Sequence, residues 1–157
     1  MKHTISVLVE NKFGVLARVA GLFSARGYNI SSLAVSETLD PTISYMTIVV
    51  DAKDEAILEQ IEKQLNKLID VITVTDFTKK THVERELILV KVNCPAKDKK
   101  KLEKNLKKFV VKLVSHKADV AIVELVGEQL QIKAALEALD KFGVKELIRT
   151  GKIAMAL

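Results

Sequence analysis

The chain has 157 residues, of which 48% are hydrophobic and 29% charged, and its formal net charge is +5. This composition is typical of a globular protein, and the length allows one ordinary domain or two small ones. The mildly basic balance permits nucleic-acid binding without favouring it. A single cysteine, Cys94, excludes an internal disulfide and fits a reducing compartment. Uncharged runs reach only ten residues, too short to cross a membrane as a helix. We therefore expect a soluble protein of the cytoplasm or, after processing, of an organelle.

Hydrophobic residues in the first half alternate between the period of a strand and that of a helix. Ile5, Val7 and Val9 recur at every second position, whereas apolar residues from Leu16 to Phe23 recur at helical spacing. We expect Gly27 to end this helix. We predict strands at 5–9, 29–37, 43–50 and 71–77, a second helix at 57–68, a bulge or polar edge at 31–32 and a proline turn at 39–42.

The second half repeats this order of elements with little residue identity. We predict a strand at 87–92, a helix at 97–109, a hairpin of strands 110–114 and 120–126 that turns at 115–117, a helix at 132–139 and a strand at 144–148. The polar stretch 78–82 separates the halves. The chain is therefore predicted to hold two domains, residues 1–78 and 79–157.

The order βαββαβ in each half predicts the fold class. It is the ferredoxin-like order, in which two helices cover one face of a four-stranded antiparallel sheet. The chain is thus expected to be α+β, with two tandem ferredoxin-like domains. In the strands of the first half, apolar residues occur at positions that point to both faces of the sheet. The same helices therefore cannot cover all of Leu8, Leu33, Val35, Val49 and Val50. This pattern predicts a partner against the open face or edge, most simply a second copy of the chain.

Residues of the kinds used in catalysis are scattered along the sequence. His3, His82 and His116 are far apart, and none has a cysteine, histidine or carboxylate at the spacing of a zinc site. Neither a P-loop nor a GxGxxG motif is present. We predict no catalytic residue and no metal site in this chain.

A lysine-rich stretch lies between residues 97 and 108. On a helix it surrounds a narrow apolar stripe of Leu102, Leu106 and Phe109, which favours a solvated helix face. RNA binding is the alternative, because RNA-recognition modules share this element order. Those modules stack bases on exposed aromatic residues of central strands, where this chain carries Ile, Val and Leu. We therefore expect no nucleic-acid partner.

The loop between the first strand and the first helix carries the strongest local signal. Gly14 stands where the helix begins, and unpaired N–H groups at a helix N-terminus suit a carboxylate. Asn11 adds an amide that both donates and accepts. Together they suit the carboxylate and amine of a free amino acid, but the loop by itself favours an ordinary strand-to-helix turn that needs a glycine for steric reasons.

Longer motifs relate the chain to a known family. The motifs are ISVLVEN (5–11), GVLARV (14–19), GLFSARGYNISSL (21–33), DPTIS (40–44), LEQIEKQLNKL (58–68), HVEREL (82–87) and RTGKIA (149–154). In this combination the chain resembles the small regulatory subunits of acetolactate synthase (acetohydroxyacid synthase). The resemblance covers essentially the whole chain and is densest over residues 1–90.

The resemblance implies an amino-acid-sensing ACT domain at residues 1–78 and a subunit that is not itself an enzyme. Such subunits bind a catalytic large subunit that uses thiamine diphosphate, magnesium and FAD, none of which this chain would hold. They raise its activity and confer feedback inhibition by valine, often also by leucine or isoleucine. One methylene changes binding by only about 1–3 kcal/mol, so valine is not ranked firmly above the other two.

By position, the resemblance also implies the effector site. It would lie between the ACT domains of a homodimer, with Asn11, Gly14, Val15 and Leu16 from one copy and Asn29 and Ile30 from the other. The glycine and the following N–H groups would bind the carboxylate, the two asparagines would orient the amine and carboxylate, and Val15, Leu16 and Ile30 would contact the branched side chain.

Departures from the family pattern occur at three positions. Lys12 and Phe13 are bulkier than the residues many members carry in this loop, and Tyr45 stands where members often have arginine. They are expected to affect effector choice or large-subunit contacts. A free-standing ACT sensor of a different partner remains the alternative function, and turnover by the chain alone would indicate an unrecognised enzyme.

Overall fold

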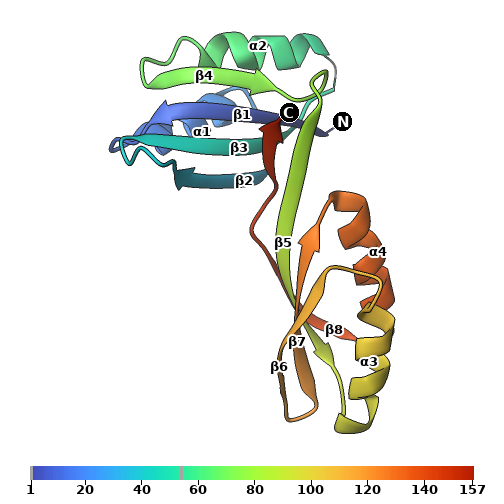
Figure 1. The fold of residues 1–157 in the computed structure, drawn as a ribbon. Coiled ribbons are helices and arrows are strands. Elements are labelled where there is room, and N and C mark those ends of the chain that lie inside the picture. Colours follow the sequence, from blue (N-terminus) through green and yellow to red (C-terminus); the bar gives the residue numbers. More distant parts are fainter. Residues whose placement is uncertain (1, 54) are drawn as a thin grey trace. The chain divides into compact units, whose positions relative to one another are not determined.

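The computed structural model describes residues 2–53 and 55–157. The first sheet is antiparallel, with the strand order β2-β3-β1-β4, and two helices connect its strands (Figure 1). The elements are β1 (Lys2–Glu10), α1 (Val15–Ala25), β2 (Ile30–Glu37), β3 (Ile43–Asp51), α2 (Glu55–Leu65) and β4 (Val71–Asp76). This is the ferredoxin-like topology predicted for the first half.

The second sheet has the same topology. Its strand order is β6-β7-β5-β8, and both α3 and α4 lie on one face of it (Figure 1). The elements are β5 (His82–Asn93), the 3-10 turn η1 (Ala96–Asp98), α3 (Lys99–Leu106), β6 (Val111–Lys117), β7 (Val120–Gly127), α4 (Gln129–Asp140) and β8 (Val144–Arg149). The predicted fold class, two ferredoxin-like domains in an α+β chain, is confirmed.

Each sheet packs one face against its helices. In the first unit Ile5, Val7 and Val9 are fully buried with Phe23 and Ile61. In the second unit Ile88, Val90 and Val92 are fully buried with Leu102 and Leu139. Every second side chain of these strands therefore packs against the apolar face of a covering helix, as the sequence pattern predicts.

Two details of the strands bear on the predictions. The bulge expected at 31–32 is present, because the register of β2 against β3 shifts between Ile30 and Ser32. The hairpin turn predicted at 115–117 is wrong: β6 continues to Lys117, which pairs with Val120. The turn consists of Ala118 and Asp119, both with positive φ, as a two-residue hairpin requires.

The chain forms two compact units, and the last residues return to the first. One unit comprises Met1–Val83 with Lys152–Leu157, and the other comprises Glu84–Gly151. The domain boundary expected at residue 78 would place residues 152–157 in the second domain, whereas they belong to the first compact unit. The C-terminal strand β9 (Ile153–Ala156), missing from the predicted elements, pairs with β5. A four-residue strand gives too short a pattern to identify in the sequence.

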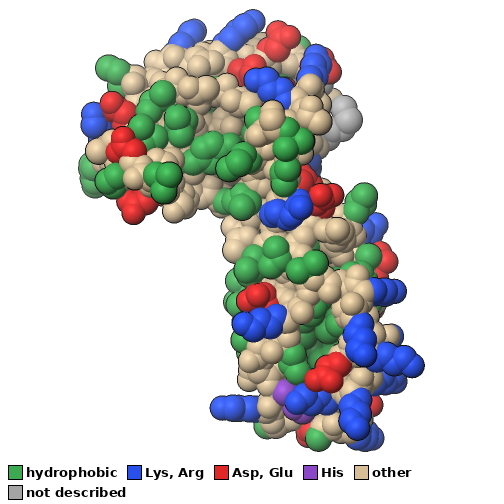
Figure 2. Space-filling model, in the orientation of Figure 1, with side chains coloured by type: hydrophobic (Ala, Val, Ile, Leu, Met, Phe, Trp, Pro, Cys, Tyr) green, Lys and Arg blue, Asp and Glu red, His purple; other side chains and the backbone are tan. Residues whose placement is uncertain are grey.

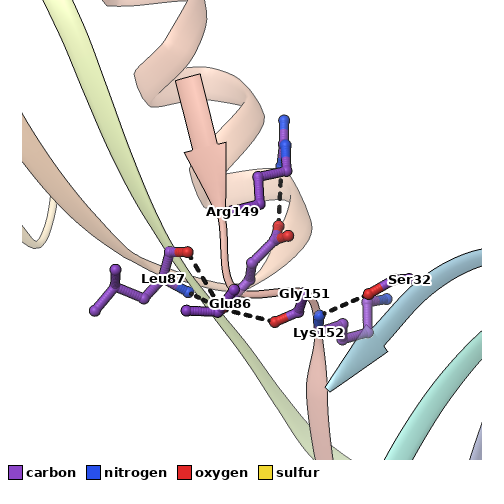
Figure 3. A network of polar contacts seen from close by, with 7 residues as sticks. Ser32, Glu86, Leu87, Arg149, Gly151 and Lys152 are labelled. Atoms are coloured by element: carbon purple, nitrogen blue, oxygen red, sulfur yellow. Dashed lines mark hydrogen bonds and ion pairs between the residues drawn. The ribbon is translucent and has the colours of Figure 1, made fainter. Parts of the chain in front are cut away.

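Polar contacts hold the residues before and after Gly151, where the chain passes from the second unit to the first (Figure 3). In the second unit Arg149 Nη1 lies 2.9 Å from Glu86 Oε2, and the Thr150 N–H donates to the Leu87 carbonyl over 3.0 Å. In the first unit the Lys152 N–H donates to Ser32 Oγ over 3.0 Å. Gly151, between these contacts, has φ +85°.

The returning segment contacts the sheet face that the helices leave open. The Tyr45 hydroxyl donates to the Ala154 carbonyl over 2.8 Å, and the Ala154 N–H donates to Thr47 Oγ1 over 3.4 Å. Ala154 and Thr47 are both buried. Part of the cover that the two-sided strand pattern predicts is therefore provided by the chain itself.

The register also sorts the apolar residues that the sequence could not assign to a face. Leu33 pairs with Ile48 and Val35 with Met46, so both belong to the helix-covered face. Val49 pairs with Thr4 on the open face and is buried.

Within the described ranges, no helix is both long and apolar enough to span a membrane.

Replacing Tyr45 with phenylalanine tests how firmly the C-terminal segment is held. Loss of the hydroxyl leaves the Ala154 carbonyl without its donor, so we expect the free energy of unfolding to fall by about 0.5–1.5 kcal/mol. Urea denaturation measures this change. Tyr28→Phe is the matched control, because no hydrogen bond of the Tyr28 hydroxyl is seen in the described structure. Equal effects of the two variants would contradict the role of the Tyr45 contact.

Candidate effector-binding site

Gly14 begins α1 in a conformation that favours glycine. Its φ is +80° and ψ −5°, in the left-handed region, and no side chain caps the helix. The Val15 N–H donates to the Lys12 carbonyl over 3.3 Å. Among the described residues, the N–H groups of Gly14, Leu16 and Ala17 have no acceptor. This end of the helix can therefore donate hydrogen bonds to an anion.

Asn11 is held beside this helix end by the turn before β3. Its Nδ2 donates to the Pro41 carbonyl over 2.9 Å, and its N–H donates to the Thr42 carbonyl over 2.7 Å. The turn is itself held by Asp40, since hydrogen bonds from the hydroxyl and N–H of Thr42 lower the pKa of the Asp40 carboxyl. The Asn11 Oδ1 makes no hydrogen bond within residues 2–53 and 55–157, so the amide can still accept one.

Arg18 brings a cation to the same place, which the sequence interpretation missed. Its Nε and Nη2 lie 2.8 and 2.6 Å from Asp70 Oδ2, and Asp70 is only 7% exposed. A Cβ added to Gly14 would lie 3.1 Å from Arg18 Nη1. Arg18 stands four residues after Gly14, the spacing that places a side chain back over a helix start. That spacing was visible in the sequence, but its partner Asp70, 52 residues away, was not.

The predicted apolar residues of this loop differ in exposure. Val15 is 3% exposed and packs in the core, so only its backbone faces the site. Phe13 is fully exposed and Leu16 is 45% exposed, so these two side chains flank the helix start. Lys12 pairs with Glu10 at 2.6 Å, and this hydrogen bond raises the pKa of Lys12.

Asn29 and Ile30 lie at the opposite end of the sheet from the other predicted site residues. Ile30 pairs with Val50 at one end of β3, whereas Glu10 pairs with Ile43 at the other. Seven residues of extended strand separate these ends by about 23 Å. Within one copy, the structure therefore brings Asn11 together with Gly14 and Leu16, but it keeps Asn29 and Ile30 away from them.

Residues suited to catalysis or metal binding do not converge in the described ranges. No group of three or more His, Cys, Asp or Glu side chains could hold a metal ion there. His116 Nε2 contacts the Cys94 carbonyl at 2.7 Å, which fixes the ring in a structural role. Burial raises the pKa of the Cys94 thiol, which makes it a poor nucleophile.

Replacing Gly14 with alanine tests the backbone requirement at the helix start. A left-handed alanine costs about 1–2 kcal/mol, so we expect the free energy of unfolding to fall by that amount in denaturant titrations. Gly21→Ala in the same helix is the matched control. A Cβ there meets nothing within 4 Å, and alanine should stabilise the helix by about 0.5–1 kcal/mol. Similar effects at both positions would contradict this account of Gly14.

Comparison with known proteins identifies relatives along the whole chain. A family model described as AHAS small subunit-like ACT domain matches residues 5–73, and one described as small subunit of acetolactate synthase matches residues 85–157. The chain is 47% identical over 155 residues to the probable acetolactate synthase small subunit of Archaeoglobus fulgidus, covering 99% of this chain and 96% of the relative. It is 41% identical over 157 residues to the acetolactate synthase isozyme 3 small subunit of Salmonella typhimurium, with coverage of 99% and 96%.

A solved structure shows the same two-domain fold. The crystal structure of the acetolactate synthase small subunit from Thermotoga maritima matches with a TM-score of 0.87 and 38% sequence identity. The match covers 100% of this chain and 98% of that one.

Proposed function

Because the chain belongs to the family of acetolactate synthase small subunits, we propose that it binds a catalytic large subunit, activates it and makes it sensitive to valine. In this proposal thiamine diphosphate, magnesium and FAD belong to the large subunit. The proposal of a valine site rests on one observation: the candidate site residues lie at two opposite ends of one sheet. Such a site is complete only when a second copy supplies the missing half.

The topology supports one way of joining two copies. β2 is an edge strand of the first sheet, and its last residue, Glu37, pairs with Ser44 beside the loop that holds Asn11. If β2 pairs antiparallel with β2 of a second copy, the start of one strand lies beside the end of the other. Asn29 and Ile30 of one copy then come to the loop of its partner. Pairing through β4, the other edge, would not bring them together.

The groups at this junction suit a zwitterionic branched amino acid. The free N–H groups at the start of α1 and the nearby Arg18 guanidinium favour its carboxylate. Amide oxygens of Asn11 and Asn29 can accept hydrogen bonds from its ammonium group. The partly exposed Leu16 and Ile30 and the fully exposed Phe13 offer apolar contacts to a small side chain.

Regulation requires that the effector favours one arrangement of the two copies over another. An effector bound between the copies has higher affinity for the arrangement that closes its site, and it shifts the equilibrium by that difference. The large subunit must then interact differently with the two arrangements. By reciprocity, binding of the large subunit would change effector affinity by the same factor.

Titration with L-valine tests the effector site. We expect stereospecific binding to the purified chain by calorimetry, and at a hundredfold excess over Kd a stabilisation of about 2.7 kcal/mol. Gly14→Asp should abolish binding and valine inhibition while activation of the large subunit persists, because its carboxylate occupies the anion position beside Arg18. Gly14→Asn is the uncharged control. Valine sensitivity retained in Gly14→Asp would exclude this site, and purification with a different enzyme would favour a free-standing sensor.

A charge placed on the β2 edge tests the arrangement of the two copies. Val35 on β2 is 40% exposed, and Val35→Lys should block strand pairing and give a monomer that no longer binds valine. Ile72 on the opposite edge strand, 49% exposed, is the matched position, and Ile72→Lys should remain dimeric. Sedimentation velocity measures both. A dimeric Val35→Lys variant, or a monomeric Ile72→Lys variant, would contradict pairing through β2.

A further inference from the structure

The lysine-rich segment around α3 carries a net charge equal to that of the whole protein. Residues 97–108 carry seven lysines and two acids, so their net charge of +5 equals that of the chain. All seven lysine side chains are exposed, and Figure 2 shows blue side chains gathered on the second unit beside α3. We call this surface the α3 lysine patch; it consists of Lys97, Lys99, Lys100, Lys101, Lys104, Lys107 and Lys108.

The patch keeps most of its positive charge, because Asp98 and Glu103 offset only two of its seven lysines. None of the seven lysines forms an ion pair with a residue in the ranges 2–53 and 55–157. Exposed lysines elsewhere do form such pairs: Lys12 with Glu10 at 2.6 Å, and Lys79 with Glu55 at 2.8 Å. Positive potential is therefore concentrated over α3.

The position of these lysines opposes the stability of their own helix. Lys99, Lys100 and Lys101 form the first turn of α3, which contains no acid, and positive charge there opposes the helix dipole. Lys100 and Lys101 also lie one turn before Lys104, a spacing at which like charges repel. Local choices that cost stability are characteristic of functional surfaces.

An apolar cleft adjoins the patch. It is lined by Lys108 and Phe109, by Val110, which is 72% exposed, and by Val126 and Ile132 from β7 and α4. Lys108 belongs to both surfaces, so the cationic patch and the apolar cleft are continuous. A ligand of matching chemistry has acidic groups beside an apolar side chain.

We propose that the α3 lysine patch and this cleft form a docking surface for an acidic, apolar-anchored face of the catalytic large subunit, an inference that rests on the proposed function. A protein occupant fits better than a nucleic acid because the cleft is largely aliphatic. The aromatic rings of this unit, Phe109 and Phe142, are half-buried and covered by Lys108 and Lys141 at 5.3 and 5.8 Å, so they offer no free stacking platform. In the complex, acidic groups of the large subunit would offset the repulsion among the lysines of the patch.

The test compares two triple variants of the full chain in binding to the catalytic large subunit. One replaces Lys100, Lys101 and Lys104 with glutamine, and the control replaces Lys117, Lys133 and Lys145, which are also exposed lysines of the second unit. Each variant lowers the net charge from +5 to +2, so only position differs. Affinity is measured by surface plasmon resonance across a series of salt concentrations.

We expect the patch variant to bind about tenfold more weakly at low salt and to show a flatter salt dependence, whereas the control binds like the unmodified chain. The free patch variant should also melt about 2–4 °C higher, because the opposing charges are removed and glutamine has a similar helix propensity. Higher stability combined with weaker binding is a result that a purely solvated surface would not give.

Several results would overturn the inference. Equal affinity of the two variants would show that the patch does not contact the large subunit, while the proposed function would stand. Tight binding of a mixed-sequence single-stranded RNA in competition with the large subunit would assign the patch to nucleic acid. Absence of any complex between the unmodified chain and the large subunit would reject both the proposed function and this surface. A lower melting temperature of the patch variant would show that the lysines stabilise the fold.

Discussion

The register of β1 against β3 is the constraint on which the first unit depends. It sets Glu10 against Ile43 and His3 against Val50, and so it defines two ends of the sheet. The loop with Asn11 and Gly14 leaves one end, and α1 carries the chain back to the other before β2 begins at Ile30. A one-residue slip would turn Ile5, Val7 and Val9 away from the helices. The buried face therefore fixes the position of the loop as well as the core.

In the function we propose, this geometry would make regulation depend on the assembly of two copies. A single copy has the helix start with its free N–H groups at one end of its sheet, and Asn29 and Ile30 at the other. An amino acid is far smaller than the distance between them, so neither half alone makes a complete site. A binding site divided between copies responds to their arrangement, which is the property that a sensor needs.

The two units divide charge unequally. The whole net charge is matched by that of residues 97–108 in the second unit, while the first unit carries the candidate effector site. Arg18 illustrates the local strategy of the first unit, since its guanidinium is paired with the buried Asp70. The lysines around α3 have no such partners in the described chain. The second unit also contains ion pairs, such as Arg149 with Glu86, so the unpaired positive charge belongs to the α3 lysine patch rather than to the whole unit.

Much of this protein was determined by its sequence alone. Alternation in β1 and helical spacing in α1 and α2 are local patterns, and they predicted the element order and fold class because burial selects residues at those periods. Motif resemblance indicated the family, which the comparisons confirm. What only the tertiary structure decided are contacts between distant residues: Asp70 with Arg18, Ala154 with Tyr45, and the burial of Val15. A sequence pattern carries information about neighbours a few positions apart, whereas these contacts join residues 52 and 109 positions apart, which only the folded chain brings together.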